Sequence, residues 1–229
     1  MSRSINAAQI RTGYTAAMGQ ELGELFHATS SELVWMHWRW KQHRTLFGDK
    51  QSRIDLLNEA APFFFHMVHD VFFEDTLLAI ARLVGSRESV DKPNLTIQRF
   101  PPLLGDLKLR DEVCGLVETA KKAAAFAIEW RNRRLAHRDL DLILKRNSQT
   151  LAPATRDQVE GSLSALRDVM NRIEVAYCNA ATRYASPAPG DAEALLYVIR
   201  DGLLRDRERR ERVKRGELLD EDIRPPEPL

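Results

Sequence analysis

The stretch PFFFHMVHDVFFEDTLLAIARLV, from Pro62 to Val84, is the part of the sequence that decides the fold class. Its apolar side chains recur on most sides at helical spacing, and a helix that is apolar nearly all round is usually central and buried. We expect one long helix from Asp55 to Val84, because proline is tolerated at an early helical position such as that of Pro62. Gly85 and Ser86 then mark its end.

Helical periodicity continues outward from this segment in both directions. No segment shows a convincing two-residue alternation of the kind that indicates a strand, and glycine and proline are sparse. The sequence therefore predicts an all-α fold, an antiparallel helical bundle of four to five long helices. The other expected helices span residues 21–47, 106–137, 155–184 and 191–203, with Asp191 as the N-cap of the last one.

Three regions are expected along the chain: a flexible N-terminus over residues 1–20, the bundle over residues 21–204, and a charged C-terminal tail over residues 205–229. Lys plus Arg (34) nearly equals Asp plus Glu (33), which excludes a globally basic protein but not a local basic patch. Cys114 and Cys178 are too few for a zinc site or a disulfide framework. Because the sequence shows no secretory leader and no apolar span, we expect a cytoplasmic protein with reduced thiols and no membrane partner.

The stretch WRNRRLAHRD, from Trp130 to Asp139, holds the residues best suited to chemistry. It places His137 among four arginines at the end of a long apolar helix, and residues 131–146 carry six Lys or Arg against two Asp. Histidine can move a proton near neutral pH, and arginine holds phosphate in a planar fork. This composition suits cleavage of a phosphodiester without a metal ion. The alternative is a basic helix terminus that the helix dipole favours.

The pair Arg131-Asn132, followed by four residues and then His137, resembles the motif of the HEPN superfamily, in which many members are RNA-cleaving toxins or anti-phage effectors. The segment HDVFFEDTLLAIARLVGSRESVDKPNLTIQRF, residues 69–100, is similar to the helix, the ARL segment and the NLT loop of the abortive-infection AbiU-like branch. WRWKQHRTLFG and AEALLYVIRDG also resemble that branch, so the resemblance covers about residues 35–202. One departure is Gly85, where that branch leads us to expect an acidic residue.

The resemblance implies an all-α bundle that dimerises so that two copies of the motif line one cleft. It also implies a ribonuclease that needs no metal and no other cofactor. Catalysis falls to Arg131, Asn132 and His137: the imidazole moves a proton at the ribose 2′-hydroxyl or the leaving 5′-oxygen, and Arg131 stabilises the phosphorane. The other arginines of the stretch would bind the substrate, namely Arg133, Arg134 and Arg138.

We therefore expect a metal-independent, RNA-cleaving effector that acts in phage defence or in a toxin–antitoxin pair. Its expected partners are the RNA substrate, a second copy of the chain, and an antitoxin or defence protein. The alternative is a non-catalytic module of the same fold that binds RNA or protein, and a third hypothesis is a helical scaffold with no nucleic-acid role. The sequence does not separate these hypotheses, because inactive relatives can keep the fold.

Helical geometry leaves the choice of arginine open. On a straight helix, Arg131 and His137 lie about 240° apart and do not share a face. Arg133 and Arg134 lie four and three residues before His137 and do share its face. Either the helix is distorted after Arg134, or a dimer completes the site, or Arg134 is the working cation.

A polar stripe of four residues interrupts the apolar helix predicted over residues 55–84. Its members are His66, His69, Asp70 and Glu74. Their spacing suits a divalent metal, and the alternative is a polar groove or hydrogen bonds between helices. We favour a supporting role without metal, and expect Asp70 and Glu74 to lie near His137 across a polar cleft, because buried polar groups need partners.

Two further segments combine positive charge with other features. Aromatic and basic side chains alternate in the segment WMHWRWKQHR, residues 35–44, as they do in proteins that bind single-stranded nucleic acid. The alternative is the edge of a core helix whose basic side chains extend toward water. Residues 205–215 carry seven Lys or Arg and three acidic residues. They indicate either a solvated charged helix or a contact with RNA or an antitoxin.

Overall fold

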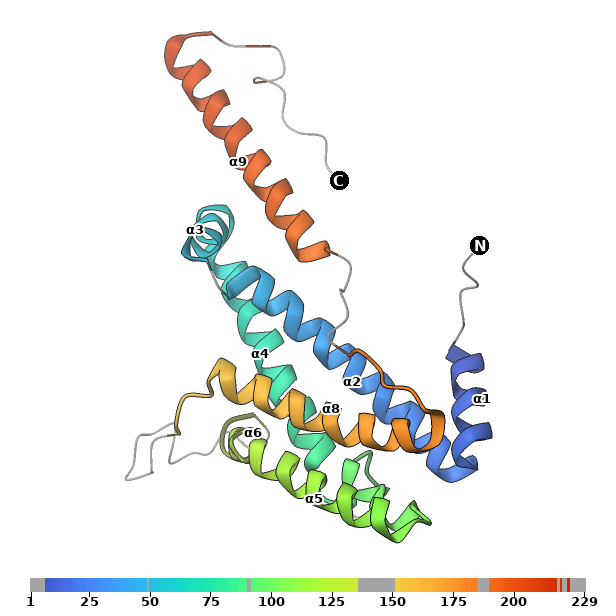
Figure 1. Cartoon of the computed structure of the whole chain (residues 1–229). Coiled ribbons are helices and arrows are strands. Elements are labelled where there is room, and N and C mark those ends of the chain that lie inside the picture. Colours follow the sequence, from blue (N-terminus) through green and yellow to red (C-terminus); the bar gives the residue numbers. More distant parts are fainter. Residues whose placement is uncertain are drawn as a thin grey trace. The chain divides into compact units, whose positions relative to one another are not determined.

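A computed structural model gives the fold over residues 7–48, 50–89, 92–135, 151–184, 190–217, 219 and 222. Helices dominate these residues, which confirms the predicted all-α fold class (Figure 1). Within them, the extended structure is a two-residue antiparallel pairing of β1 (Glu88–Ser89) with β2 (Lys92–Pro93). The α-helices are α1 (Ala7–Met18), α2 (Gln20–Phe47), α3 (Gln51–Ala60), α4 (Pro62–Val84), α5 (Leu107–Ala123), α6 (Ala125–Trp130), α8 (Arg156–Cys178) and α9 (Asp191–Arg215).

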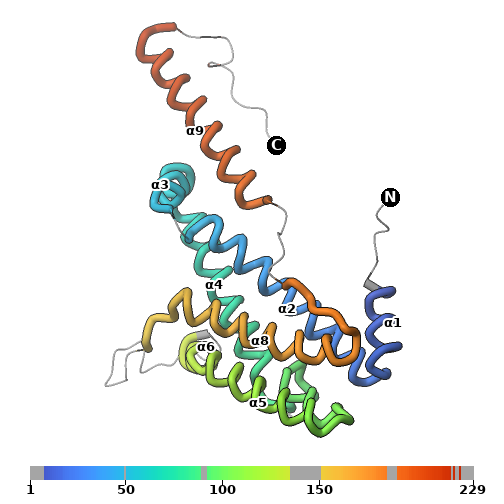
Figure 2. Tube along the Cα trace, viewed as in Figure 1, coloured from blue at the N-terminus to red at the C-terminus, as the bar shows by residue number. Residues whose placement is uncertain are grey.

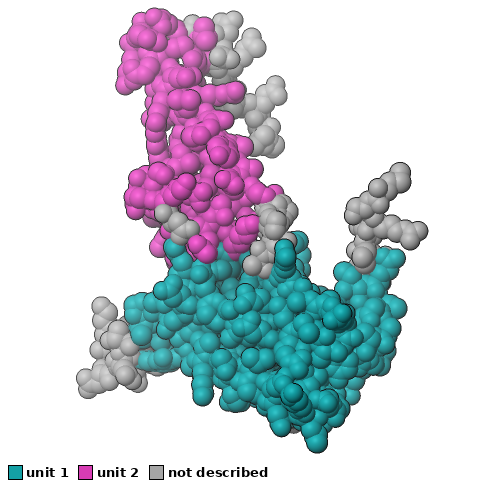
Figure 3. Space-filling view, in the orientation of Figure 1, with its two compact units in different colours: residues 1–40, 71–188 teal, residues 41–70, 189–229 magenta. Residues whose placement is uncertain are grey.

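The chain divides into two compact units (Figure 3). The first comprises Met1–Trp40 and Val71–Ala188, and the second comprises Lys41–Asp70 and Pro189–Leu229. Helices α2 and α4 each cross a boundary in the sequence, so both helices contribute residues to both units.

The first unit has its core between long helices. Helix α5 lies along α8 and runs in the opposite direction (Figures 1 and 2). The buried side chains of α8 recur at helical spacing and face apolar residues of α5, and the Ser162 hydroxyl donates to the Ala123 carbonyl at 3.0 Å. The buried apolar residues of these two helices are Leu109, Val113, Val117, Ala120, Val159, Leu163, Leu166, Val169, Met170 and Ile173.

The second unit has a smaller core, in which α3 packs against α9. The Gln42 side chain accepts a hydrogen bond from the backbone N–H of Ala192 at 3.0 Å, and Arg207 of α9 forms an ion pair with Glu59 of α3. Its buried apolar residues are Leu46, Leu57, Phe65, Ala192 and Leu196.

The single helix predicted over residues 55–84 is wrong, because the chain forms two helices there. Helix α3 ends at Ala60, Ala61 has φ −162° and ψ 77°, and α4 begins at Pro62. A residue before proline is pushed out of the helical region, and proline is well suited to the first helical position. Pro62 therefore starts a helix, whereas the prediction from sequence had Pro62 inside one.

The continuous helix predicted over residues 106–137 is also interrupted. Ala124, with φ −92° and ψ 4°, separates α5 from α6, and a π-helical turn, η3 (Arg131–Leu135), follows α6 directly. Asp106 caps the start of α5 by accepting the N–H of Leu109 at 2.6 Å. Residues 136 and 137 lie outside the described residues.

The ends of other helices also differ from the predictions, and capping residues account for the observed ends. Helix α8 starts where it was predicted to start, and Thr155 forms a capping box with Gln158 there. The helix was predicted to reach residue 184, but it stops at Cys178, where Asn179 takes the left-handed conformation (φ 49°). Gly190, not Asp191, is the N-cap of α9, and Asp191 is its first residue, where a carboxylate favours the helix dipole. Helix α9 continues to Arg215, through the segment predicted to have lost its apolar period.

The N-terminal region and α4 also depart from expectation. A flexible segment was predicted over residues 1–20, yet α1 covers Ala7–Met18 and buries Met18 in the core of the first unit. Helix α4 was predicted to be buried on most sides, but its first half exposes a row of apolar side chains. These are Phe63 (85% exposed), Phe64, Met67 and Val71.

A buried carboxylate ties α1 to the end of α8 in the first unit. Glu174 is 4% exposed and accepts hydrogen bonds from the Tyr14 hydroxyl at 2.7 Å, the Thr182 N–H at 2.7 Å and the Thr182 hydroxyl at 2.9 Å. Burial, followed by the bond to Glu174, raises the pKa of Tyr14 to about 12. The three donors satisfy the acceptor capacity that burial would otherwise leave unpaired.

Glu174→Gln should lower the free energy of unfolding by about 1–3 kcal/mol, because the new amide NH₂ faces a donor in a buried site. Chemical denaturation of the full chain measures this. Glu112→Gln is the matched control: Glu112 pairs with Arg172 at 2.5 Å, but both side chains are more than a third exposed, and such pairs contribute about 0–1 kcal/mol. Equal losses in the two variants would contradict the role given to Glu174.

Candidate functional site

The candidate site begins where α4 ends, because the last carbonyl groups of a helix need external partners. The Thr96 hydroxyl donates to the carbonyls of Leu83 and Gly85, both at 2.9 Å. The Gln98 amide donates to the carbonyls of Val84 at 2.8 Å and Gly85 at 2.7 Å. These bonds fasten the segment that follows β2, including the 3₁₀ turn η1 (Ile97–Arg99), to the helix end.

Asn94 holds the other side of this loop. Its N–H donates to the Arg87 carbonyl at 2.8 Å, and its side-chain amide donates to the Ser86 carbonyl at 3.1 Å. The Ser86 hydroxyl in turn donates to the Glu88 carbonyl at 2.8 Å. Hydrogen bonds thus fix the backbone of residues 85–89 and 92–98 beside α4.

A cavity of about 510 Å³ lies within the first unit at this point. Its walls come from α2, the end of α4, the following loop and the π-helical turn η3. It brings residues of the neighbouring ARL and NLT segments together with the Arg-Asn pair of the motif, which lies more than 30 residues further along the sequence. Its lining residues are Glu32, Ala79, Arg82, Leu83, Gly85, Ser86, Asn94, Leu95, Arg131 and Asn132.

Arg131 and Asn132 line this cavity, and their side chains are hydrogen-bonded to each other. The Asn132 amide oxygen accepts from Nε and Nη2 of Arg131 at 3.0 and 2.8 Å. Among the described residues, no carboxylate lies within ion-pair distance of Arg131. The guanidinium therefore keeps its charge for a ligand, and Asn132 orients it. π-Helical turns are rare in proteins, and those that occur are often found at functional sites.

The neighbouring arginines have other partners. Arg134 lies 3.8 Å from the Glu74 carboxylate, and its guanidinium carbon is 5.0 Å from the centre of the Trp130 ring. Arg133 forms an ion pair with Glu129 at 3.1 Å. Thus the π-helical turn presents Arg131 to the cavity, while Arg133 and Arg134 contact protein side chains.

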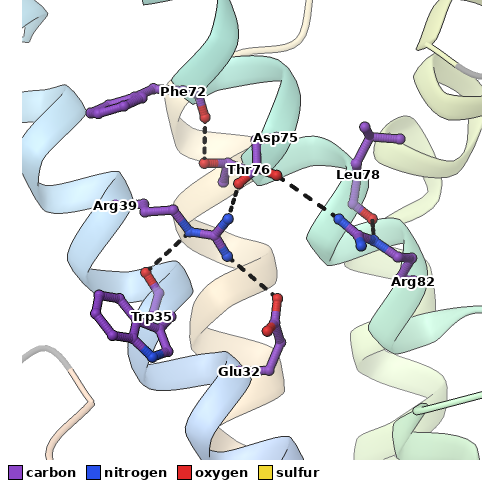
Figure 4. Close-up of polar contacts among 8 residues, drawn as sticks. All are labelled: Glu32, Trp35, Arg39, Phe72, Asp75, Thr76, Leu78 and Arg82. Carbon is purple, nitrogen blue, oxygen red and sulfur yellow. Dashed lines mark hydrogen bonds and ion pairs between the residues drawn. The ribbon is translucent and has the colours of Figure 1, made fainter.

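Four charged residues on α2 and α4 form a network beside the cavity (Figure 4). The Arg39 guanidinium lies between Asp75, which it contacts closely, and Glu32, at 3.3 Å. Asp75 is also 3.9 Å from Arg82. The ion pair with Arg39 holds the Glu32 carboxylate in place. Because Asp75 pairs mainly with Arg39, its interaction with Arg82 is weak.

The predicted polar stripe is divided between the two units. In the second unit, Asp70 lies 3.1 Å from His69 Nδ1 and 3.6 Å from His66 Nε2, and the ring of His69 lies 4.9 Å from that of His43. Glu74 belongs to the first unit, and it contacts the motif through Arg134. The expected proximity of Asp70 and Glu74 to His137 stays a prediction, since His137 lies outside the described residues.

The structure favours the structural interpretation of the aromatic and basic segment on α2. Trp40 is buried in the core, and Arg39 belongs to the network with Glu32 and Asp75. His37 stacks on Tyr184 with ring centres 6.0 Å apart, and burial, reinforced by nearby Arg167, lowers its pKa to about 4. Trp35 is the exposed aromatic residue here, at 58%.

Most charges of the predicted C-terminal tail are paired within the second unit. Arg212 binds Asp222 at 2.8 Å, Arg210 binds Asp206 at 2.7 Å, and Lys214 binds Glu211 at 2.8 Å. This pairing is typical of a solvated charged helix. Among the described residues, no group of three or more His, Cys, Asp or Glu is arranged to hold a metal ion, and no helix has the length and apolarity needed to cross a bilayer.

Only part of this site could be predicted from the sequence. Arg131 and Asn132 lie where a ligand can reach them, whereas His137 and Arg138 lie outside the described residues. Glu32, Arg82 and Asn94 were missed as site residues. The available signal was the resemblance of the ARL and NLT segments, which lay far from the motif in sequence and line the same cavity.

Comparison with protein families gives one assignment. The family model described as AbiU2, a HEPN family, matches residues 19–196, which is well over half of the chain. Comparison with curated proteins and with solved structures gives no significant match.

The partly buried His37 side chain predicts a stability that falls in acid. Its pKa of about 4 in the folded chain is below the ordinary 6.5, so the unfolded chain binds the proton first as pH falls. The free energy of unfolding should therefore drop as pH falls from about 6.5 toward 4.

His37→Phe should remove part of that drop, as measured by denaturant unfolding at a series of pH values. His66→Phe is the control, because the His66 side chain is 74% exposed. If His37→Phe keeps the full acid sensitivity of the wild type, protonation of His37 is not its cause.

Proposed function

Since the chain belongs to the AbiU2 family of HEPN domains, we propose that it is a metal-independent endoribonuclease. In this proposal it cleaves cytoplasmic RNA in abortive infection or as the toxin of a toxin–antitoxin pair, and it works as a homodimer. The observation that carries the proposal is the cavity in which Arg131, oriented by Asn132, keeps an uncompensated charge among the described residues. Such a group suits the phosphate of an RNA chain.

The proposed reaction divides the chemistry between two residues. His137 takes the proton of the ribose 2′-hydroxyl, the 2′-oxygen attacks phosphorus, and the bond from phosphorus to the 5′-oxygen breaks. The leaving 5′-oxygen then receives that proton from the His137 imidazolium, which gives a 2′,3′-cyclic phosphate and a 5′-hydroxyl and restores the neutral imidazole. Arg131 stabilises the extra negative charge of the phosphorane, where a preorganised donor contributes most. The other arginines of the stretch, Arg133, Arg134 and Arg138, would guide the RNA backbone.

The direct test is incubation of the purified full-length chain with total RNA in the presence of EDTA. We expect cleavage, with products that end in a 2′,3′-cyclic phosphate and a 5′-hydroxyl. RNA binding without cleavage would instead identify a non-catalytic binding module. Products with a 3′-hydroxyl and a 5′-phosphate would contradict the mechanism.

Substitutions separate the roles within the motif. His137→Ala should lower the cleavage rate by about 10²–10⁴, the usual loss when a general acid–base is removed. Arg131→Ala should lower it by about 10²–10³, through lost stabilisation of the phosphorane. Arg138→Ala should have a smaller effect, because Arg138 lies past the motif.

Arg134→Ala is the matched control for Arg131→Ala, since it removes the same charge from the same turn. It should reduce stability more and cleavage less, because Arg134 contacts Glu74 and Trp130. Thermal unfolding of each variant separates the two effects. If Arg134→Ala is folded and cleaves RNA more slowly than Arg131→Ala does, Arg134 is the working cation.

A further inference from the structure

The cavity beside the motif holds more recognition groups than a phosphate needs. Two guanidinium groups, from Arg82 and Arg131, face it together with one carboxylate, from Glu32. The amides of Asn94 and Asn132 add hydrogen-bonding groups, and Leu95, which is 37% exposed, is the apolar lining side chain that a ligand can reach, because Ala79 and Leu83 are almost fully buried. Its volume of about 510 Å³ falls within the usual range for small-molecule sites, about 300–1,000 Å³.

The charged side chains of this cavity can play two different roles in binding a ligand. Arg82 is 63% exposed and reaches Asp75 only at 3.9 Å, and Arg131 has no carboxylate partner among the described residues. Both can therefore bind an anion. Glu32 has Arg39 on its Oε1 atom at 3.3 Å, and its Oε2 has no hydrogen-bond partner among the described residues. The network thus supplies an oriented carboxylate acceptor in the same cavity as the two cations.

Gly85 keeps the cationic side of the cavity open. A Cβ atom at this position would lie 3.8 Å from Arg131 Nη1 and 3.1 Å from the Ala81 carbonyl oxygen. Because glycine carries no side chain, nothing at position 85 covers or neutralises the Arg131 guanidinium. The same position allows a charge to be introduced beside Arg131 as a test.

We propose that this cavity is a nucleotide subsite that selects a guanosine 5′-phosphate unit of the RNA. It binds the phosphate with Arg82 and Arg131, places the base against Leu95, and reads the guanine edge with Glu32. Guanine offers two adjacent N–H donors, N1–H and N2–H₂, which match the two acceptor oxygens of a carboxylate. Adenine, cytosine and uracil do not present that pair. The assignment to RNA rests on the function proposed above.

The test uses isothermal titration of the full-length chain with GMP, AMP, CMP and UMP in EDTA. We expect GMP to bind at least about tenfold more tightly than the others, a difference of about 1.4 kcal/mol. Glu32→Gln should abolish this preference, because its amide NH₂ opposes a guanine donor while the shape is retained. Equal binding of the four nucleotides by the wild type would overturn the proposal.

A pair of variants at position 85 tests the cationic side. Gly85→Asp and Gly85→Asn have nearly the same shape and meet the same Ala81 carbonyl oxygen, but only aspartate adds a charge beside Arg131. GMP affinity should be about tenfold lower in the Asp variant than in the Asn variant. Equal affinity in two folded variants, as shown by thermal unfolding, would overturn the assignment of Arg131 to the phosphate.

A competition experiment tests whether the ligand is part of an RNA chain or a free nucleotide. Its outcome also distinguishes a failure of the subsite from a failure of the proposed cleavage activity. A uridine oligonucleotide with one guanosine should displace GMP, and the all-uridine oligonucleotide should not. Failure of the guanosine oligonucleotide to compete would overturn the assignment to RNA. If the wild type shows the GMP preference and the competition but does not cut RNA, the subsite stands and the proposed function fails. Cleavage without any GMP preference would overturn the subsite alone.

Discussion

The end of α4 is the constraint on which the site depends. Helix carbonyls at a C-terminus must find donors, and here two side chains from one segment, Thr96 and Gln98, donate to the carbonyls of residues 83–85. Those bonds set the path of the loop, which in turn places Ser86, Asn94 and Leu95 around the cavity. A helix end and a loop without periodicity therefore define a site that the motif alone does not form.

Charge balance then determines what the cavity can bind. Arg39, Asp75 and Glu32 are each about one-third exposed, so their ion pairs add little to stability, about 0–1 kcal/mol each. Their importance lies in orientation. Arg39 holds two carboxylates, and this leaves Arg82 and Arg131 as the weakly compensated cations beside the cavity. The opposite arrangement, with each arginine paired to its own acid, would leave no net field for an anion.

Periodicity and capping residues predicted the helices better than the breaks between them. The helix observed over Gln20–Phe47 and the helix start at Thr155 followed from apolar spacing and from residues that favour a helix start. The break at Ala61 was missed because the apolar pattern continues across Pro62, and proline is compatible with either interpretation. The division into two units was missed for a related reason, since α2 and α4 run through both without a change in composition.

The π-helical turn explains why sequence spacing gave an ambiguous choice of arginine. In a regular α-helix, residues three apart share a face, so Arg131 and Arg134 would point the same way. The structure separates them: Arg131 lines the cavity with Asn132, and Arg134 contacts Trp130 and Glu74. A turn with i to i+5 hydrogen bonds advances each residue by a smaller angle than the α-helix does. The prediction that Arg131 and His137 do not share a face assumed a regular α-helix, and this premise does not hold over Arg131–Leu135.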